Sequence, residues 1–243
     1  MPKRHFFFTP KLGGANLFFK FSKMKFRLFF SLIFLLIGWH SFAQMDSLST
    51  KYREDQFYVS FALQLQQQNI SGFKQNGFSN NFQVGFVRDT PLNSKGTVAL
   101  GVGLGYAYNR IFSNLRLQKE EVNILFSVQE NEKNLQTYSS FVIPLSFRYR
   151  TSTSYRTDFW RIYGGIKYKL NFAAKYTPFY GKAFKYDFIR KNNTAVFLSM
   201  GYNTWNIFFE YYLNSIYTSR AQLPSGASIN LHTYQLGLIF YIL

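Results

Sequence analysis

The sequence predicts an all-β fold: an eight-stranded antiparallel up-and-down transmembrane β-barrel, preceded by a cleavable signal peptide. Three observations lead to this prediction. Aromatic residues make up 21% and charged residues only 16% of the 243 residues, whereas soluble domains carry about 25% charged residues. Apolar and polar residues alternate with a period of two from residue 57 onward. The connections between the alternating segments are long and short in turn, as in transmembrane barrels.

Composition and charge exclude several classes of function. The chain contains no cysteine, which excludes disulfides, thiolate metal sites and cysteine nucleophiles. A net charge of +17 is typical of proteins that bind nucleic acid, but seven of the 28 Lys and Arg residues lie in the first 27 positions. Removing residues 1–43 leaves 21 basic and 11 acidic residues, without a contiguous basic cluster. We therefore expect no nucleic-acid partner.

A secretory leader is predicted at residues 24–43. A short basic stretch precedes the apolar run Leu28–Gly38, and Ser41 and Ala43 supply the small residues for cleavage before Gln44. As a helix this run is too short for the ~30 Å hydrocarbon core of a bilayer, so a membrane anchor is not expected.

The leader divides the chain into four segments. We expect residues 1–23 to be an N-terminal extension, mis-assigned or disordered, with Met24 as the true start. Residues 44–56 are expected to form a periplasmic segment, and residues 57–243 the barrel.

The eight expected strands follow from the alternation and are taken in chain order. They cover about 57–66, 80–88, 97–109, 135–150, 160–172, 194–203, 206–215 and 229–243. The connections between them contain about 13, 8, 25, 9, 21, 2 and 13 residues. An even number of strands with long external loops and short periplasmic turns places both termini in the periplasm.

Residue size decides which face of the strands points outward. In the third strand large residues such as Leu100 and Leu104 alternate with Gly101, Gly103 and Gly105. A soluble lipocalin-like barrel would place the large residues inside, but an eight-stranded barrel is too narrow for Leu and aromatic side chains from every strand. The apolar face is therefore predicted to face lipid.

Aromatic residues are expected to form a girdle at each rim of the barrel. Trp160, Trp205 and Tyr149 lie at the predicted periplasmic rim. The predicted external rim holds Tyr106, Tyr108 and Phe172.

The last strand carries the spacing of an outer-membrane assembly signal. Gln235, Gly237, Leu238, Phe240 and Ile242 follow the order polar, Gly and three apolar residues. This pattern predicts the barrel-assembly machinery as a partner during insertion.

Several turn and strand-end segments resemble the PorT-like outer-membrane β-barrel family, over roughly residues 52 to 243. They are Phe86–Asn93, Phe159–Tyr163, Gly201–Asn206 and Gly237–Ile242. The resemblance implies an outer-membrane barrel and, through the founding member, a link to type IX protein secretion, with secretion-system proteins as partners. It transfers no catalytic residue.

Few residues of the mature chain point to catalysis. His232 is the one histidine that remains after the leader is removed. Its position in the period-two alternation of the last strand places it on the outer face near the external rim. We expect an interfacial role for His232, and no catalytic residue, cofactor or metal site. An outer-membrane lipid-modifying enzyme is the alternative.

Inward-pointing charges predict an ion cluster in the lumen. Arg148, Arg161 and Glu210 all lie at periplasmic depth, and a single charge left alone in a narrow barrel would be costly. Lys167 and Lys169 lie higher and have no obvious partner. The cluster is expected to plug and rigidify the barrel.

The third external loop is basic and is a candidate contact for lipopolysaccharide phosphates. Its cations include Lys182, Lys185, Arg190 and Lys191. A solvated loop is the alternative interpretation.

Together these patterns predict a multi-pass protein of the outer membrane that is not an enzyme. Its role is expected to be structural or accessory in the envelope, with outer-membrane lipid and lipopolysaccharide as partners. A narrow porin-like channel is the alternative, although open aqueous channels need about 16 strands.

Overall fold

The computed structural model describes residues 55–67, 70–119, 124–151 and 160–242. These residues all belong to the unit Thr50–Leu243. The predicted extension, the predicted leader and most of the 44–56 segment lie outside the described residues. No helix in the described part of the chain is long and apolar enough to cross a membrane.

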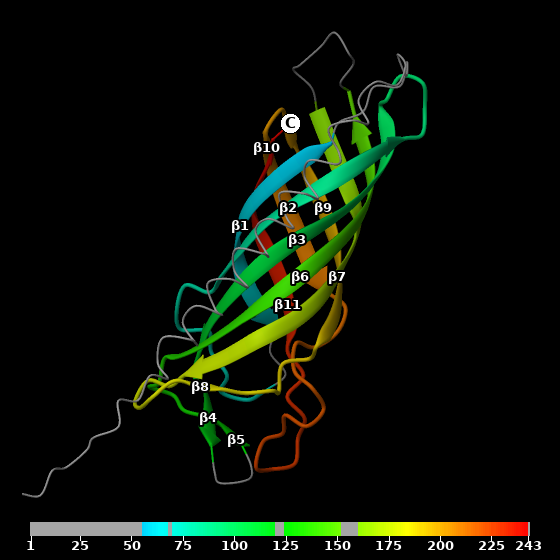
Figure 1. The fold of residues 1–243 in the computed structure, drawn as a ribbon. Helices are drawn as coiled ribbons and strands as arrows, with labels where there is room; N and C mark the ends of the chain where they lie inside the picture. The colour runs from blue at the N-terminus through cyan, green and yellow to red at the C-terminus, as the bar shows by residue number, and fades with distance from the viewer. Residues whose placement is uncertain (1–54, 68–69, 120–123, 152–159, 243) are drawn as a thin grey trace, which may run out of the picture. The chain divides into compact units, whose positions relative to one another are not determined.

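Eight long strands form the barrel, and three short strands extend from one end of it (Figure 1). The barrel strands are β1 (Gln56–Gln67), β2 (Asn80–Pro91), β3 (Val98–Ser113), β6 (Asn134–Arg150), β7 (Trp160–Thr177), β9 (Asn192–Tyr202), β10 (Trp205–Tyr212) and β11 (His232–Ile242). The short strands are β4 (Leu115–Lys119), β5 (Ile124–Val128) and β8 (Phe184–Lys185).

Antiparallel pairing between neighbours in the chain closes the barrel. Each barrel strand pairs with the next, and β1 pairs with β11 from Phe57↔Ile242 to Gln67↔His232. The prediction of eight antiparallel strands in up-and-down order is therefore confirmed.

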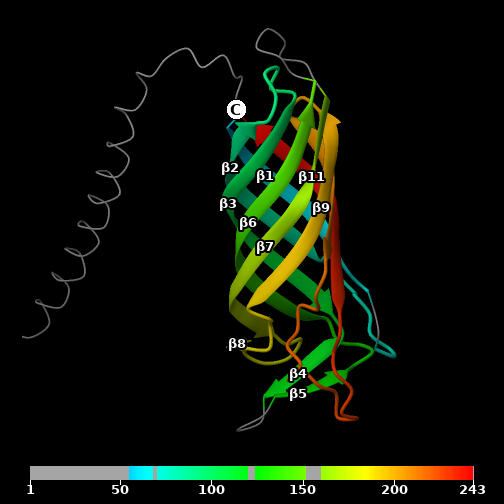
Figure 2. The same ribbon diagram turned by 90° about the vertical axis from the view of Figure 1, so that its right-hand side faces the viewer.

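The two ends of the barrel differ, as Figures 1 and 2 show. The end that carries Gln56, Ile242 and the turns 92–97 and 203–204 is called the turn end. The opposite end, called the loop end, carries the β4–β5 hairpin, β8 and the long connections.

Strand length varies around the barrel because three neighbours continue toward the loop end. β3, β6 and β7 contain 16, 17 and 18 residues, whereas β10 contains 8. The prediction ended β7 at Phe172, but a β-bulge lets the strand continue to Thr177. At this bulge Ala173 and Ala174 both lie opposite Tyr138, and Ala173 has a φ of 54°. The extra residue reverses which side chains face inward.

Side chains alternate between the two faces of the barrel as predicted. In β1, Phe57, Phe61 and Leu63 point outward, while Tyr58 and Gln64 are buried in the lumen. The predicted girdle residues also point outward at both rims. The outer face is thus apolar, with aromatic residues near both ends, as in a lipid-embedded barrel.

Small residues in β2 and β3 make room for a large ring in the lumen. A Cβ atom at Gly85 would lie 2.6 Å from the Tyr58 ring. At Gly105 it would meet the Tyr58 hydroxyl. Because glycine fills these two positions, the ring packs directly against the barrel wall.

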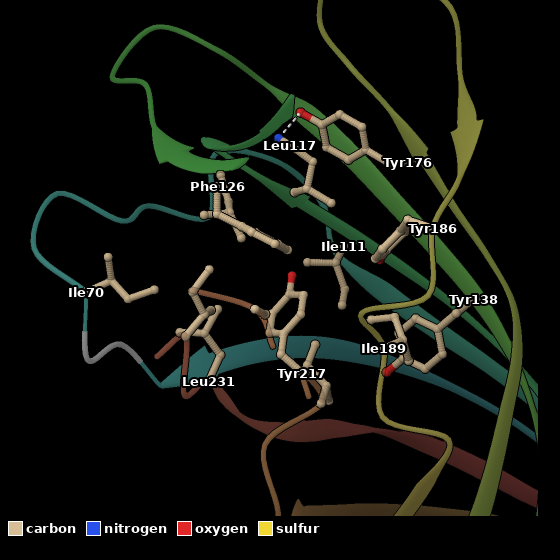
Figure 3. Close-up of a cluster of buried hydrophobic side chains, with 14 of the residues drawn as sticks. Ile70, Ile111, Leu117, Phe126, Tyr138, Tyr176, Tyr186, Ile189, Tyr217 and Leu231 are labelled. Carbon is tan, nitrogen blue, oxygen red and sulfur yellow. Dashed lines mark hydrogen bonds between the residues drawn. The ribbon is translucent and has the colours of Figure 1, made fainter. Parts of the chain in front are cut away.

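The long connections fold over the loop end and form a hydrophobic core of their own (Figure 3), which we call the cap. Each loop contributes to it: Phe73 from the first, Phe126 from the β4–β5 hairpin, Ile189 from the third and Tyr217 from the fourth. The Leu117 backbone N–H of β4 donates to the Tyr176 hydroxyl of β7 at 3.1 Å. This cap was not predicted from the sequence.

Candidate functional site

A network of charged groups crosses the middle of the lumen. Lys167 Nζ of β7 lies 2.8 Å from Glu210 Oε2 of β10, and Lys169 also contacts the Glu210 carboxylate. Lys167 donates at 3.2 Å to Gln83 Oε1 of β2. Lys169 donates at 2.7 Å to the Tyr212 hydroxyl. Because β7 and β2 are separated by β6 and β3, the network bridges the barrel from wall to wall.

A second network lies nearer the turn end. The Asp89 carboxylate of β2 accepts hydrogen bonds from both Arg148 and Arg150 of β6. Arg148 also donates to Gln56 Oε1 at 2.5 Å, and Arg150 Nε donates to the Gly96 carbonyl at 3.0 Å. One carboxylate thus holds two guanidinium groups and links three strands.

Aromatic rings line the lumen beside this second network. The Arg148 guanidinium lies 4.0 Å from the Tyr163 ring centroid, and the Arg161 guanidinium lies 5.9 Å from that of Tyr241. Cation–π contacts stabilise charged groups that are shielded from water. The Tyr163 and Tyr241 rings pack edge to face at 5.2 Å.

The predicted single cluster of Arg148, Arg161 and Glu210 is wrong in its pairing. Glu210 lies in the row Glu210↔Phe197↔Gly165, one inward-facing position from Lys167. Arg161 lies two inward positions from Gly165 on the other side, about 13 Å along the strand. The prediction placed Arg148, Arg161 and Glu210 at the same height along the barrel axis. The separation of about 13 Å along the strand instead puts Arg161 and Glu210 at different heights, beside different networks.

Asp89 was missed because the predicted strand ended at residue 88. The inward alternation of β2 continues through Gln83, Val87 and Asp89, all buried. Extending the period-two pattern by one position would have placed the Asp89 carboxylate in the lumen.

The four basic loop residues predicted to contact lipopolysaccharide lie in different settings. Lys182 and Lys191 are exposed, and Lys185 is exposed on β8. Arg190 is half-buried, and its Nε donates to the Ser215 carbonyl at 3.1 Å. The Arg190 side chain therefore holds two loops of the cap together.

His232 lies on the outer face at the loop end, as its parity predicted. Its ring stacks on Tyr211 at 6.1 Å, and Nδ1 lies 3.3 Å from the Tyr212 carbonyl oxygen. Among the described residues, no three His, Asp or Glu side chains are grouped so that they could hold a metal ion.

A shallow apolar groove of about 540 Å³ lies on the outer face near the turn end. Its lining includes Trp160, Met200, Tyr202, Trp205 and Ile207. It belongs to the surface predicted to face lipid.

The fold and the lumen define a class of protein, an integral membrane β-barrel with an apolar exterior and a bridged, charged interior. A family model described as "Outer membrane protein beta-barrel domain" matches residues 42–217. The chain belongs to this family and is an outer-membrane β-barrel protein.

Comparisons with individual proteins add little to the family assignment. No curated protein matches the chain significantly. Two crystal structures of Ail, the attachment invasion locus protein of Yersinia pestis, are similar. One, in complex with the heparin analogue sucrose octasulfate, is 13% identical, with 78% of this chain and 99% of that chain covered and a TM-score of 0.37. The other is 14% identical, with 77% and 97% covered and a TM-score of 0.35.

Proposed function

We propose that the protein is a closed, non-enzymatic barrel that serves as a structural or accessory component of the outer membrane. In this proposal the cap faces the cell exterior, and both termini lie in the periplasm. The barrel anchors the four loops at the membrane surface.

The observation that carries the proposal is the bridged lumen beneath the cap. The Lys167–Glu210 pair, with the hydrogen bond from Lys167 to Gln83, links β7 and β10 to β2 across the lumen, and the Asp89 network lies nearer the turn end. Buried residues of all four loops cover the loop end. This arrangement favours a closed barrel over the narrow porin-like channel.

Conductance separates these two functions. We expect the purified mature chain to insert into planar bilayers without stepwise conductance, at both low and high salt. Stable conductance steps from the wild-type protein would contradict a closed barrel. A variant with Glu210→Ala tests whether the lumen network is what blocks ion flow.

The surroundings of His232 support a non-enzymatic role over a lipid-modifying enzyme. Its ring lies flat against Tyr211 and its Nδ1 faces a backbone carbonyl, rather than a side-chain hydroxyl nucleophile. We expect no turnover of phospholipid or lipid A by the wild-type protein. A hydrolytic activity that His232→Ala abolishes would contradict this.

Orientation can be tested because the chain contains no cysteine. We expect Tyr180→Cys, in a loop beside β8, to react with a membrane-impermeant maleimide in intact cells. Ser94→Cys, in the exposed turn 92–97, should react only after the outer membrane is permeabilised. The reverse labelling would overturn the proposed orientation.

An accessory role in type IX protein secretion is the narrower form of the proposal, and it rests on the PorT-like turn and strand-end segments. Its test is cargo secretion in a deletion strain, scored with envelope proteins that co-purify from native outer membranes. Normal secretion without co-purifying secretion proteins would remove this role and leave the closed barrel in place.

A further inference from the structure

Three basic residues and one threonine form a row across four neighbouring strands on the outer face near the loop end. Arg110 of β3 pairs in register with Thr137 of β6, Thr137 with Lys175 of β7, and Lys175 with Lys185 of β8. Residues opposite each other in antiparallel strands project to the same face. We call these four residues the basic row.

The basic row lies directly above an aromatic belt. The next outward residues toward the turn end are Tyr108, Ser139 and Phe172. The Phe172 ring stacks on Phe141 at 4.7 Å, and the Tyr106 hydroxyl lies 2.7 Å from Ser139 Oγ. In a membrane barrel such aromatic belts mark the level where lipid chains meet headgroups. The basic row therefore lies at headgroup level.

The cations of this row have no acidic partner in the described part of the chain. Arg116 nearby is paired with Glu132 at 3.1 Å, but none of the three basic-row cations forms an ion pair. Like charges directly opposite each other, as in Lys175↔Lys185, destabilise a strand pair. An anion bound between them would reverse the sign of this interaction.

A further cation lies above the row. Arg110 and Lys133 approach the Phe112 ring, at 5.4 Å and 5.0 Å from its centroid. The Lys133 side chain passes over Gly77, where an added Cβ would lie 2.6 Å from its Cε. Glycine at this position allows the Lys133 ammonium to lie close to the Arg110 end of the basic row.

We propose that the basic row binds the phosphate groups of a diphosphorylated glycolipid of the lipid A type, with its acyl chains packed on the aromatic belt. The row spans three strand spacings, or about 14 Å. A headgroup with one phosphate would reach cations at one end of it, whereas one with two phosphates reaches Arg110 and the Lys175–Lys185 pair together. Arg110 can bind a phosphate bidentately, and the lysines act as point charges.

This inference rests on the proposed function, because it requires the loop end to lie in the outer leaflet. It differs from the sequence-based lipopolysaccharide contact in its residues. Only Lys185 is shared, while Lys182, Arg190 and Lys191 lie outside the basic row. A double variant of the two exposed residues, Lys182→Gln with Lys191→Gln, is therefore a matched control.

The experiment measures binding of diphosphoryl lipid A to the purified mature protein in a zwitterionic detergent, by native mass spectrometry and by the shift in unfolding temperature. We expect the triple variant Arg110→Gln, Lys175→Gln and Lys185→Gln to bind at least tenfold more weakly than wild type. The control double variant should bind like wild type. Monophosphoryl lipid A should bind wild type more weakly than the diphosphorylated form.

A second measurement separates binding from folding. Without lipid, Lys175→Gln should unfold at the same or a higher temperature than wild type, because a like-charge contact is removed. With diphosphoryl lipid A, the same variant should gain less stability than wild type. A purely structural role for Lys175 would not produce this opposite response.

Three results would overturn the inference. These are equal lipid A binding by wild type and the triple variant, equal loss in the control double variant, and equal affinity for phosphatidylglycerol and diphosphoryl lipid A. None of them bears on the closed barrel, which the conductance and labelling experiments test separately.

Discussion

The ammonium of Lys167 and the carboxylate of Glu210 meet at 2.8 Å in the middle of the lumen, and both side chains are almost fully shielded, with 3% and 0% exposed. Lys169 contacts the same carboxylate. One acid therefore compensates two buried bases, and its removal leaves both without an ionic partner among the described residues.

We expect Glu210→Gln to lower the free energy of unfolding by about 3 to 5 kcal/mol, because it leaves the buried ammonium groups of Lys167 and Lys169 without a counter-charge. The measurement is urea unfolding in lipid vesicles, followed by tryptophan fluorescence. Glu130→Gln, in an exposed loop, is the matched control. Replacing all three residues with apolar ones (Lys167→Met, Lys169→Met, Glu210→Leu) should restore most of the stability. A loss below 1 kcal/mol for Glu210→Gln would show that the network contributes little.

The two lumen networks are expected to act independently. Asp89→Asn should destabilise the barrel for the same reason as Glu210→Gln, since Arg148 and Arg150 share the Asp89 carboxylate. Because the networks share no partner, the two effects should add to within about 0.5 kcal/mol. A cycle that combines Asp89→Asn with Arg148→Gln should instead show strong coupling. Strong coupling between Asp89 and Glu210 would favour the single cluster that the sequence suggested.

The bulge in β7 predicts a stabilising substitution. Ala173 has a φ of 54°, a left-handed conformation that costs a residue with a Cβ about 1 to 2 kcal/mol. Glycine avoids this cost but loses more backbone entropy on folding, by roughly 0.5 to 1 kcal/mol. Ala173→Gly should therefore raise the free energy of unfolding by about 0.5 to 1 kcal/mol. Ala174→Gly, next to it without a positive φ, should lower it, and the same sign for both would argue against backbone strain.

The cap is expected to loosen at alkaline pH. Tyr186 and Tyr217 lie in loops, and both hydroxyls donate to Gln136 Oε1, at 2.9 Å and 2.6 Å. Burial raises the pKa of both phenols well above their usual value of about 10. The folded cap thus keeps protons that the open loops release. Its stability is complete below pH ~10 and falls as the pH rises toward the folded pKa values.

Limited proteolysis of the loops, with tyrosinate absorbance recorded in parallel, measures this loosening. We expect cleavage to increase steeply above pH ~10. The double variant Tyr186→Phe with Tyr217→Phe should be less stable at pH 7, because Gln136 loses two donors, but should respond less to alkali. An identical pH response in the variant and wild type would assign the loosening to other groups.

The strand pattern was predictable because lipid and lumen demand opposite side chains at neighbouring positions. In β3 the alternation of Leu100 and Leu104 with small residues determined both the strand and its outward face. The same rule failed where the backbone departs from regular pleating. At Ala173 the bulge shifts the alternation by one residue, so the last five residues of β7 were assigned to a loop.

Pairing inside the lumen was less predictable than the strands. The period-two alternation showed that the side chains of Lys167, Arg161 and Glu210 point inward. Which of them form ion pairs depends on their heights along neighbouring strands. The register of the paired strands β7, β9 and β10 gives these heights, and it places Glu210 far from Arg161. The cap could not be predicted from the sequence for another reason. Phe73 and Tyr217 lie far apart in the sequence and in loops without periodicity, so their contact leaves no local pattern.

The cap also constrains how the surface of this protein can change. In many barrels each surface connection is modular, so that one can be exchanged or lengthened without disturbing the others. Here Phe73, Phe126, Ile189 and Tyr217 come from four connections and pack in one shared interior. Replacing a single connection would open a void beneath the remaining three. We therefore expect natural variation, and successful insertion of foreign peptides, to be confined to outer tips such as the exposed segment 224–228.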